Sequence, residues 1–373
     1  MTAIGPTPED LLSHRPALRP DILLSAPLLN GPTLVHLVKD PISGASFELG
    51  PKEFFLVSRL DGARSLAEIG TEYGRAFGRR LGPVHWKQLL GLLGTRRLLA
   101  GGPPPEVPAT PTTRRTNTVL RGTMRLVADA DATTARLHRA LRALLHPAPL
   151  LLLLASCLAM EGWLATQVAQ LVRDGWWLVR NPVPMLAVAT LLWLSTALHE
   201  LAHGVAARHF GGRVGEIGLR WRLPVAIMYC TVENYRYLKR RRDQLAVAAA
   251  GAFANLVFLL PFFLWWAALP SDDATHRVLS GLLLLGSAQA LVNLVPLPPL
   301  DGYTMLSHAL RVTRLAPASL TYLRLRLGDR AAAGAYPPRA RVLYTLYALV
   351  AACVLLLLAL GLSAVLWYAA TTS

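Results

Sequence analysis

Five long apolar segments constrain the fold of this chain more than any other feature of its sequence. A helix needs about 20 consecutive apolar residues to cross the hydrocarbon core of a bilayer. Backbone N–H and C=O groups cannot be left unpaired in lipid, so we expect each segment to form a helix. The segments that predict about five membrane-spanning helices are residues 148–172, 184–207, 245–269, 278–297 and 342–368.

Composition supports a chain that lies largely in lipid. Hydrophobic residues make up 53% of the 373 residues and charged residues 16%, whereas about 25% of a typical soluble domain is charged. These values exclude a collagenous, disordered or disulfide-stapled chain. Cys157, Cys230 and Cys353 lie far apart in the sequence, and we interpret them as small hydrophobic residues.

The charged residues predict the orientation in the membrane. The net charge is +16, but the basic residues lie between the apolar segments, so we expect no nucleic-acid partner. Arginines gather before the first segment and after the second and fourth, whereas Asp272 and Asp273 lie between the third and fourth. Because positive loops face the cytoplasm, we predict a cytoplasmic N-terminus and an outside C-terminus. The excess of arginine over lysine and the abundance of alanine, leucine, glycine and proline suggest a GC-rich, bacterial genome. We therefore expect the chain in a bacterial cytoplasmic membrane.

Residues 1–102 have the pattern of a small soluble domain. Ser65 and Glu68 form a capping-box pattern, and Pro83 suits the first turn of a helix. The expected elements are strands at 33–40 and 45–49, and helices at 51–60, 65–77 and from Pro83 onward. Two short strands and three helices predict a small α+β winged-helix domain.

Residues 103–147 connect this domain to the membrane segments. Prolines in the first part predict a semi-rigid linker, and residues 121–146 predict an amphipathic helix near the membrane surface. We expect residues 148–373 to form the membrane domain. The predicted fold is therefore a mainly α, polytopic membrane protein with a small α+β domain at its N-terminus.

One short motif near the end of the second apolar segment carries chemistry. It reads His199-Glu200-Leu201-Ala202-His203. On a helix, residues four apart share a face, so both imidazoles can bind one metal, and Glu200 can take a proton from metal-bound water. Zinc lowers the pKa of that water to about 7. The alternative is a set of buried polar residues that packs a helix bundle, but ionisable groups within a membrane segment are costly and usually functional.

Asp301 is the candidate for a third metal ligand. It follows a proline-rich stretch at the end of the fourth segment, residues 293–302. The second and fourth segments run in the same direction, so His203 and Asp301 are expected at a similar depth near the cytoplasmic face. The alternative is a turn residue at the membrane interface.

The pairing of His199-Glu200-Leu201-Ala202-His203 with a distant Leu300-Asp301-Gly302 resembles the site-2 protease family of intramembrane zinc metallopeptidases. The resemblance covers residues 182–310. It implies that His199, His203 and Asp301 bind Zn²⁺ and that Glu200 is the catalytic base.

The same family has a glycine-to-asparagine element, which is present here as Gly251 to Asn255, with Ala252 where the family usually has proline. Asn255 can donate to the scissile carbonyl or the oxyanion, and Asn293 is a weaker candidate for this role. A structural amide between helices is the alternative for both residues.

Residues 216–223 alternate between apolar and polar side chains, which predicts a strand. A free strand edge near the zinc would hold an extended substrate by β-augmentation. The alternative is an amphipathic hairpin that rests on the membrane.

The N-terminal domain resembles the PqqD-like domains that recognise leader peptides of ribosomally made, post-translationally modified peptides. The matching elements are the strand pair at 33–49, the Leu60-Asp61-Gly62 turn and the helix at Ser65. The resemblance implies that a leader peptide adds as a strand to the sheet edge, which we expect near residues 34–38. A regulatory winged helix is the alternative, and the lack of a dense basic helix disfavours DNA binding.

Together these features predict an intramembrane zinc endopeptidase that removes the leader from a modified precursor peptide, similar to the membrane metalloproteases of daptide-type pathways. The lipid bilayer and modification or export proteins are the further partners expected. One alternative substrate is a membrane-anchored transcriptional regulator. The non-enzyme alternative is a membrane scaffold that presents a peptide.

Overall fold

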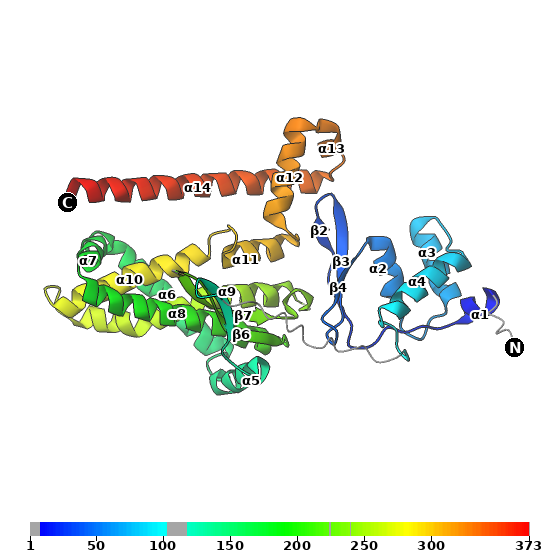
Figure 1. The fold of residues 1–373 in the computed structure, drawn as a ribbon, viewed down its shortest axis with the longest axis horizontal. Helices are drawn as coiled ribbons and strands as arrows, with labels where there is room; N and C mark the ends of the chain where they lie inside the picture. The colour runs from blue at the N-terminus through cyan, green and yellow to red at the C-terminus, as the bar shows by residue number, and fades with distance from the viewer. Residues whose placement is uncertain (1–7, 103–117, 224, 239, 373) are drawn as a thin grey trace. The chain divides into compact units, whose positions relative to one another are not determined.

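The computed structural model describes residues 8–102, 118–223, 225–238 and 240–372. The chain divides into two compact units, and Figure 1 draws the helices and strands of both. The first unit comprises Met1–Thr113 and Arg311–Leu349, and the second comprises Arg114–Leu310 and Val350–Ser373.

The sheet of the first unit is built around β3 (Thr33–Lys39). This strand pairs antiparallel with β1 (Leu23–Leu24), β2 (Leu28–Asn30) and β4 (Ser46–Leu49). The predicted strand pair is therefore confirmed, whereas β1 and β2 were not predicted. These two strands are too short to show alternation, and they form because β3 supplies their hydrogen-bonding partners.

Helices α1 (Pro8–Ser13), α2 (Pro51–Val57), α3 (Leu66–Phe77) and α4 (Pro83–Thr95) complete this N-terminal part. The predicted capping box is confirmed: the Ser65 hydroxyl accepts a bond from the Glu68 N–H, and the Glu68 carboxylate accepts one from the Ser65 N–H. Such a cap stabilises a helix by about 1 kcal/mol. Trp86, Leu66 and Ile69 are almost fully buried and form the centre of the core.

The expected peptide-binding edge near residues 34–38 is wrong, because β3 lies inside the sheet. The edge of β2 is also covered: the Leu29 N–H donates to the Arg311 carbonyl (2.8 Å), and the Thr313 N–H donates to the Leu29 carbonyl (2.9 Å). Among the strands that the structure describes, β4 pairs with β3 alone. On the side of β3 opposite β1, β4 is therefore the outermost strand of this sheet among the described residues.

The C-terminal part of the first unit is helical. It contains α12 (Leu315–Gly328), α13 (Arg330–Gly334) and the beginning of α14 (Pro338–Thr372). Tyr344 on α14 donates a hydrogen bond of 3.0 Å to the Gly31 carbonyl in the β2–β3 turn. This bond and the pairing at Leu29 join residues 311–349 to the N-terminal sheet.

Helices dominate the second unit. They are α5 (Ala130–Leu141), α6 (Pro147–Thr166), α7 (Val168–Arg180), α8 (Pro182–His209), α9 (Arg241–Ala268), α10 (Ala274–Asn293), α11 (Asp301–Leu310) and the part of α14 from Val350 onward. Its core is apolar and closely packed, since a Cβ on Gly281 would lie 2.5 Å from the Leu178 side chain and one on Gly286 would lie 2.6 Å from Leu259.

Within the described residues, four helices are long and apolar enough to cross a membrane: α6, α8, α9 and residues 338–364 of α14. They correspond to four of the five predicted spans. The fifth, at 278–297, is present as α10 but is not among the four, because His276, Arg277 and Gln289 make this helix too polar. The first span is also shorter than predicted, since α6 ends at Thr166 and α7 begins anew at Val168.

A small sheet lies beside α8 in this unit. It has the order β5 (Arg121–Arg125), β6 (Val214–Arg222) and β7 (Val225–Val232). The strand expected at 216–223 is thus confirmed as β6. The amphipathic helix expected at 121–146 is wrong over its first residues, because 121–125 pair with β6, and the helix extends only over α5.

Candidate active site

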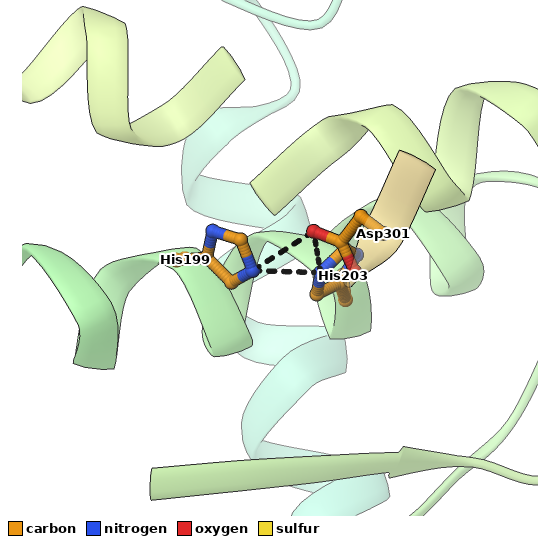
Figure 2. A group of neighbouring side chains, drawn as sticks. All are labelled: His199, His203 and Asp301. Atoms are coloured by element: carbon orange, nitrogen blue, oxygen red, sulfur yellow. Dashed lines mark hydrogen bonds and ion pairs between the residues drawn. The ribbon is translucent and has the colours of Figure 1, made fainter. Parts of the chain in front are cut away.

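Three potential metal ligands from two helices meet inside the second unit (Figure 2). His199 and His203 lie one turn apart on α8, and Asp301 is the first residue of α11. Oδ2 of Asp301 is 3.0 Å from Nε2 of His199 and 3.3 Å from Nε2 of His203, and the two Nε2 atoms are 3.2 Å apart. His199 is buried, whereas His203 and Asp301 are partly buried.

Hydrogen bonding indicates which atoms of this cluster are available to a cation. Nδ1 of His203 lies 2.7 Å from the Val247 carbonyl, which can only accept, so Nδ1 carries a proton and Nε2 is the ring atom that could bind a metal. Oδ2 of Asp301 is also buried and receives no hydrogen bond within the described residues. These two atoms lie 3.3 Å apart, so both could bind one cation placed beside them.

The spacing of the three atoms suits zinc. Zn–N and Zn–O bonds of about 2.0–2.1 Å in a tetrahedral arrangement separate neighbouring ligand atoms by about 3.3 Å. The separations here are 3.0 to 3.3 Å. Three protein ligands leave the fourth position of a tetrahedron open, as in catalytic zinc sites. The site can therefore hold a metal ion and a water or substrate atom.

Gly251 on α9 leaves space beside the two imidazoles. A Cβ at this position would lie 2.5 Å from Nε2 of His199 and 2.5 Å from Nε2 of His203, which is closer than real Cβ atoms approach. The backbone of α9 can therefore pass directly beside both imidazoles. No other residue type provides this clearance.

The chain between α10 and α11 explains how Asp301 reaches the site. Helix α10 ends at Asn293, and Pro296, Pro298 and Pro299 interrupt helical hydrogen bonding until α11 begins. Gly302 then packs closely against the turn. A Cβ at this position would overlap the carbonyl oxygen of Leu294. This close approach directs the Asp301 side chain toward α8.

Glu200 lies between the two histidines in sequence and contacts β7. Its Oε2 accepts a hydrogen bond of 3.0 Å from the Cys230 N–H. Seven residues earlier on α8, the Trp193 indole donates a bond of 3.2 Å to the Ala226 carbonyl. Because alternate residues of a strand face the same edge, positions 226, 228 and 230 present their backbone groups to α8. The strand edge that we expected near the site is therefore present in β7. Two of its backbone groups, the Cys230 N–H and the Ala226 carbonyl, are already bonded to side chains of α8.

The two asparagines of the sequence analysis lie in different surroundings. Asn255 on α9 is only 1% exposed. Its amide nitrogen lies 3.1 Å from Nδ1 of His199, and its amide oxygen accepts a hydrogen bond of 3.1 Å from the Ser195 hydroxyl. A metal bound at Nε2 would put the His199 proton on Nδ1, and the amide would then have to turn so that its oxygen, not its nitrogen, faces the ring. Asn293 ends α10, and no hydrogen bond described in this unit joins it to the three ligands.

Sequence reasoning missed several residues that support the ligands. Ser195 orients Asn255, the Val247 carbonyl fixes His203, and the Cys230 N–H holds Glu200. Two of these groups belong to the backbone, so no side-chain pattern identifies them. The spacing of Val247, Gly251 and Asn255 along one face of α9 was the available signal.

Comparison with known proteins gives one result. No curated protein and no solved structure matches the chain. The model of peptidase family M50 matches residues 187–277, which include His199, Glu200, His203 and Asn255 but end before Asp301. The matched residues are therefore similar to peptidase family M50, and the described residues also contain four helices apolar enough to cross a membrane and a cluster that could hold a metal ion.

Proposed function

We propose that the chain is a zinc endopeptidase of the site-2 type, and that it removes the leader from a ribosomally made, modified precursor peptide. The observation that carries the protease assignment is the set of three potential ligand atoms within 3.0 to 3.3 Å of one another, with Glu200 adjacent in sequence to His199. The match to peptidase family M50 supports the same chemistry.

In this proposal His199, His203 and Asp301 hold the zinc, and Glu200 moves the proton. A bound zinc would polarise the scissile carbonyl and lower the pKa of a water molecule to about 7. The Glu200 carboxylate accepts a proton from the attacking water and passes it to the amine nitrogen as the peptide bond breaks. The water oxygen and its remaining hydrogen stay with the new carboxyl group.

The substrate would be held as an extended strand along β7. Supporting this, the backbone groups of residues 226, 228 and 230 face the side on which Glu200 lies. Pairing there would place a substrate carbonyl next to the metal ligands. Because Trp193 and Glu200 bond to this edge, the strand must displace both contacts.

The N-terminal domain would bind the leader. Supporting this is the edge of β4, which pairs only with β3 among the described strands. A peptide that adds as a strand gains main-chain hydrogen bonds with little dependence on its sequence. A tethered recognition domain raises the effective concentration of a weakly bound peptide at the protease.

Replacing Glu200 by Gln tests the proposed chemistry. The amide keeps the size of the side chain but cannot take up a proton, so cleavage of a precursor peptide in detergent or vesicles should fall by at least about 100-fold. Zinc content, measured by elemental mass spectrometry, should stay at about one ion per chain. Retained cleavage would show that Glu200 is not the base, and wild-type protein without zinc would exclude the zinc mechanism.

A further inference from the structure

We infer that Gln244 and His308 form a positioning pair that fixes α11, and with it Asp301, relative to the other two metal ligands. This inference rests on the proposed function in that it assigns a role within the same metal site. Neither residue was assigned a function from the sequence, and neither is a metal ligand.

Gln244 connects three segments of the second unit. Its side-chain Oε1 lies 3.0 Å from Nδ1 of His308 on α11, and its Nε2 donates to the Leu238 carbonyl at 3.1 Å. Its own carbonyl accepts a bond of 2.8 Å from the Tyr235 hydroxyl. Gln244 itself belongs to the first turns of α9. One side chain therefore ties α9 to α11 and to the segment that follows β7.

The position of His308 on α11 makes this contact relevant to Asp301. Seven residues, or about two helical turns, separate them, so both lie on the same face of the helix. Asp301 is at one end of that face, where Gly302 packs against the preceding turn. His308 is near the other end, where it bonds to Gln244. A short helix held at both ends has little freedom to rotate about its axis or slide.

The surroundings of His308 favour a single hydrogen-bonding arrangement. Burial, with a smaller effect from the charge of Arg236, lowers the pKa of His308 to about 4, so the ring is neutral near pH 7. The ring also packs edge-on against Tyr235, with centroids 4.5 Å apart. Because Oε1 of Gln244 can only accept, the proton of the neutral ring lies on Nδ1. The Gln244–His308 bond then has one defined direction.

The same helix already supports the other two ligands. On α9, the Val247 carbonyl bonds to His203 and the Asn255 amide contacts His199. Gln244 lies three residues before Val247, on the same face. With Gln244 included, α9 supports all three ligands: His203 and His199 directly, and Asp301 through His308.

The test measures metal affinity in the full-length protein without substrate. His308→Phe keeps an aromatic ring against Tyr235 but removes the donor to Gln244. Loss of an outer partner of a metal ligand weakens binding about 10- to 100-fold. Since His308 acts through its helix, we expect about a tenfold weaker zinc affinity in competition with a chromophoric chelator. The visible absorption of Co²⁺-loaded protein should shift in the same variant, because it reports ligand geometry.

Two further variants separate positioning from general damage. His276→Phe makes the same change at another buried histidine of this unit, whose ring packs against Trp266, and it should leave zinc affinity unchanged. His308→Gln retains an N–H donor for Gln244 and should restore zinc affinity to within about twofold of wild type. Equal losses in His308→Phe and His276→Phe, or no rescue by His308→Gln, would overturn the inference.

These outcomes are distinct from a failure of the proposed function. Wild-type protein that binds no zinc would contradict the protease assignment itself. Wild-type protein that binds zinc, with unchanged affinity and an unchanged Co²⁺ spectrum in His308→Phe, would contradict only the positioning role.

Discussion

At the scale of single residues, the missing side chain of Gly251 is as important to the candidate site as the ligands. The built Cβ position lies 2.5 Å from atoms of both His199 and His203. Gly251→Ala should therefore force α9 away from α8 or rotate the imidazoles. We expect the zinc content to fall from about one ion per chain to a small fraction of that value, as measured by elemental mass spectrometry after purification.

Gly162→Ala is the matched control for this prediction. Gly162 lies within α6, and a Cβ there meets no heavy atom within 4 Å. The control should retain zinc and cleavage activity. Normal zinc binding by Gly251→Ala would show that the space beside the imidazoles is not needed for the metal.

The sequence predicts the side chains that form the cluster, but it does not predict the backbone groups that hold them in place. The four-residue spacing of His199 and His203 requires only a helix, and the Leu300-Asp301-Gly302 motif pointed to the third residue of the cluster. The contacts made by the Val247 carbonyl and the Cys230 N–H depend on how α9 and β7 pack against α8. Every residue has such backbone groups, so only the fold determines which of them reach the site.

At the scale of secondary-structure elements, local signals predicted those elements that local interactions define. Helix α3 begins after its Ser65 cap as expected, because a capping box involves only four consecutive residues. The residues of β5 were expected to be helical, and this prediction failed. The strand forms through pairing with β6, about a hundred residues later in the chain, and no local signal shows that pairing. Helix α10 is long enough to cross a membrane, but because of its polar residues it is not among the four helices that are also apolar enough to do so.

The contact between α8 and β7 leads to a prediction about substrate access. If a substrate pairs with β7, it must first break the bond from the Trp193 indole to the Ala226 carbonyl. Trp193→Phe removes this donor and keeps an aromatic ring. A hydrogen bond contributes about 0.5–1.5 kcal/mol, so the variant should cleave peptide with a kcat/KM about two- to tenfold higher, mainly through a lower KM.

Trp163→Phe provides the control for this measurement. Trp163 lies on α6, is 57% exposed, and the same substitution there should leave kcat/KM unchanged. A lower kcat/KM for Trp193→Phe would mean that the contact organises the site for catalysis, and that β7 does not have to separate from α8.

At the scale of the whole molecule, the two units have separate parts in the proposed function. The ligand cluster and Glu200 belong entirely to the second unit, and the open strand β4 belongs to the first. The sequence predicted that a sheet edge would bind the peptide but assigned it to β3. That error arose because the strands covering β3 include two short ones that the sequence pattern does not show.

The backbone direction of β4 provides a way to test peptide recognition without touching the protease unit. The N–H of Leu37 bonds to the Ser25 side chain and its carbonyl accepts from the Ser25 N–H, so both groups point away from β4. Glu48 is paired with Leu37, and its own N–H and carbonyl must then face the open edge. Glu48→Pro removes a donor from that edge and leaves the bonds between β3 and β4 in place.

We expect Glu48→Pro to raise the KM for a precursor that carries its leader by about tenfold and to leave the KM for a leaderless peptide unchanged. The control is Glu48→Ala, which also loses the bond between the Glu48 carboxylate and Asn30 (3.0 Å) but keeps the backbone N–H. It should behave like wild type. Equal kinetics for both variants on both peptides would place leader recognition elsewhere.

A membrane-anchored regulator cleaved equally well by wild type and Glu48→Pro would favour that alternative substrate, because such cleavage does not require strand addition at β4.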